Sequence, residues 1–196
     1  MVMMNNPGRT ALNELMREAE RYVLFQMNTS GECPPRLYMD GSEGRHIFTP
    51  RSLASEKHKD DFARLARLTC VAHTADATVM VSESWMVSAK NGKPPDLAVA
   101  PSQSPDREEV VTLMGESREG MRQKIFPLLR HQNGKFKGLG EAREMEADTP
   151  AGRFTHFVPA EPPTRQEREE ARAILEGEGL IKARKKEERE ERGMER

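Results

Sequence analysis

One glutamate stands out as a candidate for chemistry, in residues 77–89, ATVMVSESWMVSA. Read at period two, this segment predicts a β-strand with one buried face, and Glu83 falls on that face together with Trp85. A carboxyl group on an apolar face has a raised pKa, because burial disfavours its charged form, and it can act as a general acid or base. The alternative is a structural carboxylate that turns outward or pairs with a cation across the sheet. The candidate cations are Arg107, Arg122 and Lys124.

The serines of this segment are candidates for a nucleophile, whereas the two cysteines bear on the redox state of the chain. Ser82, Ser84 and Ser88 share the opposite face of the same segment. A serine nucleophile needs a general base and usually a sharp turn such as G-x-S-x-G, and the sequence shows neither, so these serines predict a polar face of a sheet. Cys33 and Cys70 are unclustered in a chain without an apolar signal segment, so we expect reduced thiols.

Histidine and glycine patterns give no motif for a metal or a cofactor. The five histidines are His46, His58, His73, His131 and His156. None belongs to H-x-x-x-H, H-E-x-x-H or a Cys–His cluster, so we expect no metal site. The glycine-rich residues 134–140 lack the G-x-x-x-x-G-K-[ST] pattern of a phosphate loop and predict strand bends instead. We therefore expect no cofactor.

Basic residues gather in residues 122–137, where Asn133 and Gly134 predict a hairpin turn. Cations interleaved with Phe136 can bind a nucleic-acid backbone, but lysines also protect an exposed sheet edge from pairing. The formal net charge of −1 removes the broad positive field that nucleic-acid binding uses, so edge protection is favoured. The residues that we predict to contact a partner are Trp85, Lys124, Arg130, Lys135 and Lys137.

The elements that must position these residues follow from periodicity and turn residues. Amphipathic helices are predicted over residues 10–27 and 55–72, and a charged helix over 164–175. Strands are predicted over 36–40, 45–49, 77–89, 107–115, 121–131, 135–145 and 153–158. Pro127 is expected to place its strand at an edge or to end it. This order predicts an α+β fold, an antiparallel or mostly antiparallel sheet with the two helices of the N-terminal half on one face, plus the charged C-terminal helix.

Composition divides the chain into a core-forming part and a charged end. We expect a disordered N-terminus over residues 1–9, an α+β domain over 10–158, and a linker with a charged helical tail over 159–196. The tail mixes lysine and arginine with glutamate, so its charge largely cancels. No apolar run reaches the length of a membrane span, and we expect a cytoplasmic protein that does not contact membranes.

Without a catalytic motif, the sequence favours a small non-enzymatic protein that acts by protein–protein interaction. A bacterial or phage accessory or inhibitor protein fits this description, and self-association through a sheet edge is a related expectation. Two alternatives stay open. One is an enzyme with an acidic active site around Glu83, assisted by a histidine and closed by the loop over residues 91–106. The other is a nucleic-acid-backbone binder that uses the hairpin 122–137.

Overall fold

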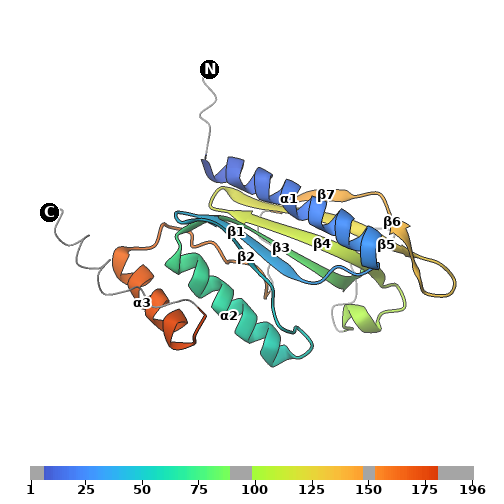
Figure 1. Ribbon diagram of the computed structural model, residues 1–196. Helices are drawn as coiled ribbons and strands as arrows, with labels where there is room; N and C mark the ends of the chain where they lie inside the picture. Colours follow the sequence, from blue (N-terminus) through green and yellow to red (C-terminus); the bar gives the residue numbers. More distant parts are fainter. Residues whose placement is uncertain (1–6, 89–98, 148–152, 181–196) are drawn as a thin grey trace, which may run out of the picture.

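The computed structural model describes residues 7–88, 99–147 and 153–180. Within these ranges the chain forms three α-helices, one short 3-10 turn and a seven-stranded antiparallel sheet (Figure 1). The helices are α1 (Pro7–Ser30), α2 (Glu56–Ala72) and α3 (Arg165–Gly177), and the 3-10 turn is η1 (Pro101–Gln103). The strands are β1 (Arg36–Gly41), β2 (Gly44–Phe48), β3 (Ala75–Met86), β4 (Glu108–Ser117), β5 (Gly120–Arg130), β6 (Phe136–Leu139) and β7 (Arg143–Ala147). The predicted α+β class with an antiparallel sheet is confirmed.

The strands follow the order β2-β1-β3-β4-β5-β6, and β7 also pairs with β5. Strand β5 therefore lies inside the sheet and continues through Pro127, unlike the predicted edge strand. The carbonyl of Pro127 accepts a hydrogen bond from the N–H of Gly140 on the outer side, where the partner changes from β7 to β6. In an antiparallel sheet the N–H and C=O of one residue point to the same side of the strand. The N–H that Pro127 lacks would therefore point to this outer side, where the pairing changes from β7 to β6 and no donor is required.

The helices α1 and α2 pack on opposite faces of the sheet. Helix α1 buries its apolar stripe against the face that carries Val79 and Val81 of β3. Helix α2 packs against the other face, where Met39 of β1 and Met80 of β3 lie. Side chains alternate along a strand, so neighbouring residues 79 and 80 serve two separate cores. The expectation that both helices cover one face is therefore wrong, because β3 is buried on both faces in its first half.

The charged C-terminal helix α3 packs against α2 (Figure 1). Its N-terminus is a capping box, in which Thr164 and Glu167 bind each other's backbone N–H groups. Ala171 and Leu175 are buried against Ala72 of α2. Residues 181–196 of the expected tail lie outside the described residues. None of the helices that the structure describes is long and apolar enough to cross a lipid bilayer.

The last predicted strand, residues 153–158, is not a strand. Both carboxylate oxygens of Glu116 on β4 accept backbone hydrogen bonds there, from Phe157 and from Val158, each at 3.1 Å. Phe157 is buried in the core beneath α2, and Glu116 is 5% exposed. Its burial raises the pKa of the Glu116 carboxyl above its ordinary value. The side chain of Glu116, rather than a neighbouring strand, therefore accepts the backbone hydrogen bonds of this segment. Alternation of residue types in the sequence could not reveal this contact.

Candidate functional site

Strand β3 loses one of its two neighbours halfway along its length. Strand β1 begins at Arg36, which lies opposite Val81, whereas the pairing of β3 with β4 continues to Met86. Residues 82–86 therefore have a strand neighbour on one side only, within the parts of the chain that the structure describes. Proline has no N–H to donate, and Pro34 and Pro35 stand where β1 would otherwise extend. The outer edge of residues 82–86 is left with backbone groups that no described strand pairs.

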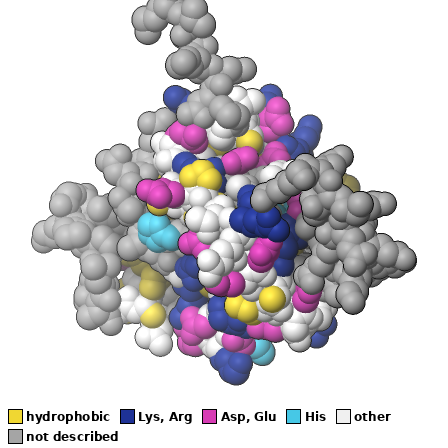
Figure 2. Space-filling model, turned by 90° about the vertical axis from the view of Figure 1, so that its left-hand side faces the viewer, with side chains coloured by type: hydrophobic (Ala, Val, Ile, Leu, Met, Phe, Trp, Pro, Cys, Tyr) yellow, Lys and Arg dark blue, Asp and Glu magenta, His cyan; other side chains and the backbone are white. Residues whose placement is uncertain are grey.

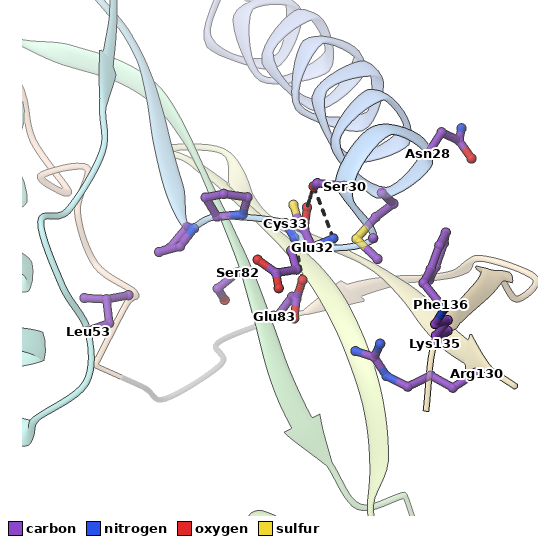
Figure 3. Close-up of a pocket in the computed structure, with 14 residues that line it drawn as sticks. Asn28, Ser30, Glu32, Cys33, Leu53, Ser82, Glu83, Arg130, Lys135 and Phe136 are labelled. Atoms are coloured by element: carbon purple, nitrogen blue, oxygen red, sulfur yellow. Dashed lines mark hydrogen bonds between the residues drawn. The ribbon is translucent and has the colours of Figure 1, made fainter. Parts of the chain in front are cut away.

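A groove of about 910 Å³ lies beside this edge (Figure 3). Its walls are the C-terminal end of α1, residues 31–35, β3 and the hairpin of β5 and β6. Gly31 makes the turn that ends α1, with a φ of +72° that glycine adopts without strain, and its N–H binds the carbonyl of Met27. A Cβ at Gly31 would lie 3.0 Å from the Cβ of Phe136, so the close approach of α1 to β6 also favours glycine.

Glu83 lies at the centre of the groove (Figure 3). One of its carboxylate oxygens, Oε1, accepts a short hydrogen bond from the backbone N–H of Cys33. Burial raises the pKa of the Glu83 carboxyl, and the nearby Glu109 and Glu32 carboxylates raise it further. The Cys33 N–H and the Arg130 guanidinium act in the opposite direction. Glu83 is thus a half-buried carboxyl that ionises less readily than usual, as the sequence predicted for an acid–base group.

The cations that the sequence offered as partners for Glu83 lie elsewhere. Arg107 stacks over the ring of Trp85. Arg122 binds the side-chain oxygen of Asn13 at 2.6 Å. Lys124 forms ion pairs with Glu20 at 2.9 Å and Glu144 at 3.0 Å. None of these three cations pairs with Glu83, because acceptors on α1 and β7 or an aromatic ring hold them, and the arginine whose charge acts on Glu83 is Arg130 of β5.

Cys33 is not equipped to act as a nucleophile. Its thiol is buried, and burial together with the Glu83 carboxylate raises its pKa to about 12. A thiol with this pKa is almost entirely protonated at neutral pH. No histidine is among the described residues that line the groove, and the described chain holds no cluster of three metal-ligating side chains. The groove thus contains an acid–base carboxyl without the histidine that the enzyme hypothesis requires.

Trp85 is 42% exposed, although the sequence predicted that it would be buried. It shares the α1 side of β3 with Val81, but α1 ends at Ser30 and does not extend over this end of the sheet. The guanidinium carbon of Arg107 lies 4.8 Å from the ring centroid. On the opposite side of the strand, the hydroxyl of Ser84 is bound to that of Thr112 at 3.1 Å, as expected for a polar face.

The basic hairpin 122–137 is divided into neutralised and free cations. Lys124 is held by carboxylates, and Arg130 forms two hydrogen bonds of 2.5 Å with Glu109. Lys135 and Lys137 are exposed, and Lys135 lines the groove. On the face shown in Figure 2, positive and negative side chains are interspersed. The structure therefore brings Glu83, Arg130 and Lys135 together around the groove, and Trp85 lies on the same side of β3. Of the other predicted contact residues, Lys124 lies beneath α1 and Lys137 lies outside the groove lining.

Sequence reasoning missed the contribution of residues 31–35 to the site. Glu32 and Cys33 come from a loop that periodicity leaves unassigned, yet they face β3 across fifty residues of sequence. The signal was present in Gly31 and in the Pro34–Pro35 pair, which together predict a helix end followed by a chain that cannot enter a sheet ladder. Comparisons with protein-family models, curated proteins and solved structures gave no match.

Proposed function

We propose that the protein is a binding module that acts by protein–protein contact, and that an extended segment of its partner pairs with the outer edge of residues 82–86. The single observation that carries this proposal is the unpaired half-edge of β3 at the floor of an open groove. Strand addition to such an edge is a recurrent mode of peptide recognition, in which main-chain hydrogen bonds give affinity and alternate side chains give specificity.

The surroundings of the edge support this mode of binding. The exposed ring of Trp85 offers apolar surface on the α1 side, and aromatic side chains contribute strongly to protein interfaces. The small hydroxyl side chains of Ser82 and Ser84 lie on the other side. Natural sheets protect free edges with charges, prolines or bulges, and the two prolines here end β1 rather than cover β3.

The enzyme alternative rests on Glu83, whose raised pKa and position in a groove suit a general acid. It lacks a partner group, because Cys33 is protonated and no histidine is found among the described lining residues. The nucleic-acid alternative is weakened by the carboxylates that neutralise Lys124 and Arg130. Both alternatives remain hypotheses that rank below peptide binding.

Hydrogen exchange of backbone amides tests the proposal directly. Extended peptides would be selected from a random display library, and exchange would be followed by mass spectrometry with and without the selected peptide. The amides of residues 82–86 that point away from β4 should become at least about tenfold more protected in the complex, because a new strand ladder removes them from solvent, whereas the alternate amides already point towards β4. Residues 77–81 serve as the internal control, since both of their edges are already paired. Peptides that bind without protecting residues 82–86, or the absence of any binder, would overturn the proposal.

A further inference from the structure

Glu83, on the free edge of β3, has a hydrogen-bond donor for only one of its two carboxylate oxygens among the described residues. Oε1 of Glu83 accepts the Cys33 N–H, whereas Oε2 has no hydrogen-bond or salt-bridge partner among the described residues. The side chain lies in the groove rather than in bulk solvent, so this oxygen is partly desolvated. An oxygen that no protein group binds can accept a donor from a ligand, and a cationic donor would form the stronger, charge-assisted hydrogen bond with it.

The charges around Glu83 also favour a cation. Glu32 and Glu109 both act on the Glu83 carboxyl with the same sign of charge. Arg130 points towards the same space (Figure 3), but Glu109 already holds its guanidinium through two hydrogen bonds. Once this neutral pair is set aside, Glu32 and Glu83 face a single lysine, Lys135, on the hairpin wall. The groove thus offers more negative than positive charge to whatever enters it.

Strand geometry fixes which side chain of a bound segment would meet Glu83. In a paired strand, the residue directly opposite projects to the same face, with Cβ atoms roughly 4.5–5.5 Å apart. The residue two positions further along projects to that face too, next to Trp85. We infer that the partner segment carries a lysine or arginine opposite Glu83 and an apolar residue two positions away, opposite Trp85. This inference rests on the proposed function, and it names the chemistry of the segment that the edge selects.

A set of synthetic peptides tests this chemistry. The parent is an alternating Thr/Val peptide of about nine residues, long enough to span the edge. Its central valine is replaced by lysine, arginine, glutamine or glutamate in four variants. Binding is read from the fluorescence of Trp85, the single tryptophan of the chain, which lies on the edge itself. The lysine and arginine peptides should bind about tenfold more tightly than the glutamine peptide, and the glutamate peptide more weakly still.

Two protein variants separate the role of Glu83 from a general charge effect. Glu83→Gln should bind the lysine and glutamine peptides equally, because its neutral amide gives a cation no advantage. Glu170→Gln, a charge-matched control on the exposed side of α3, should keep the full preference for lysine. Thermal unfolding of both variants checks that each is folded. A lysine preference that persists in Glu83→Gln, or equal binding of the lysine and glutamine peptides to the wild-type chain, would overturn the inference.

The outcomes distinguish this inference from the proposed function. If all four peptides bind with equal affinity and protect residues 82–86 from exchange, the proposal of strand addition is supported. The inference of a lysine or arginine opposite Glu83 is then wrong. If none of them protects residues 82–86, the inference of a lysine or arginine opposite Glu83 is overturned. The proposal of strand addition is then decided by the peptides from the display library. Light scattering across a range of protein concentrations is run alongside. A dimer whose residues 82–86 are protected without peptide would show that a second copy occupies the edge, and it would overturn both the inference and the partner-segment proposal.

Discussion

The two halves of β3 differ in their neighbours and in the burial of their side chains. Residues 77–81 lie between β1 and β4, with α1 packed on one face and α2 on the other, and their apolar side chains are buried. Among the described strands, residues 82–86 pair with β4 alone, and Trp85 is exposed. The alternation of side chains is the same throughout. The difference shows that neighbouring elements, rather than the strand's own residues, decide which half is core and which half is surface.

Two buried or half-buried glutamates, Glu116 opposite the first half of β3 and Glu83 in its second half, differ in the same way. Glu116 lies opposite Thr78 in the closed half, and its two oxygens each accept a backbone N–H. Glu83 in the open half accepts one backbone N–H and is half buried. Burial raises the pKa of both groups. Glu116 thus holds residues 157–158 against the sheet with both oxygens, whereas only one oxygen of Glu83 has a donor among the described residues.

Removing the two carboxylates should separate a structural role from a binding role. Glu116→Ala leaves two buried backbone N–H groups without an acceptor, which should lower the free energy of unfolding by about 2–4 kcal/mol. Glu83→Ala frees one N–H inside an open groove, where water can replace the carboxylate, and should cost less than about 1 kcal/mol. Urea denaturation of both variants measures these losses. Equal losses would contradict the division between the closed and the open half.

Truncating apolar side chains on the same face of β3 sharpens the comparison. Val81 is fully buried, and Val81→Ala removes two methyl groups from the α1 core at a cost of about 2 kcal/mol in the free energy of unfolding. Trp85→Ala removes a much larger side chain from the open half, but we expect a loss of less than about 1 kcal/mol, since no helix packs on it. If Trp85→Ala proves the more destabilising of the two, the second half of β3 is covered in solution.

The sequence predicted the positions of helices and strands along the chain better than it predicted which of them lie next to one another in space. Helix and strand periods located α1, α2 and most strands, because these patterns reflect which faces are buried. The same period placed Trp85 in the core, and it failed there because the end of α1 at Ser30 is a three-dimensional boundary. Glu83 was singled out as an inconsistency on an apolar face, yet its partner Cys33 could not be foreseen across fifty residues. Local spacing carries no information on such long-range contacts.

The pH dependence of stability provides a smaller test of the two carboxylates. A glutamate whose folded pKa is raised binds protons more readily in the folded state than in the unfolded chain. Its stabilising contribution is fully present below the ordinary glutamate pKa of about 4.3, and it is lost as the pH rises through the raised value. Glu83→Gln should therefore flatten the fall in unfolding free energy above that pH, as measured by urea denaturation at a series of pH values. An unchanged slope would mean that Glu83 is solvated like a surface carboxylate.

The smallest effect concerns the contact between Arg107 and Trp85. The guanidinium covers one face of the indole at 4.8 Å, and it is itself held by the carbonyl of Ser102. Arg107→Ala should leave stability almost unchanged, because a cation–π contact at an exposed site contributes about 0.5–1 kcal/mol. The quenching of tryptophan fluorescence by acrylamide, a neutral quencher, should increase because that face becomes accessible, whereas Arg165→Ala on the distant helix α3 should leave it unchanged. No increase would mean that the arginine does not shield the ring.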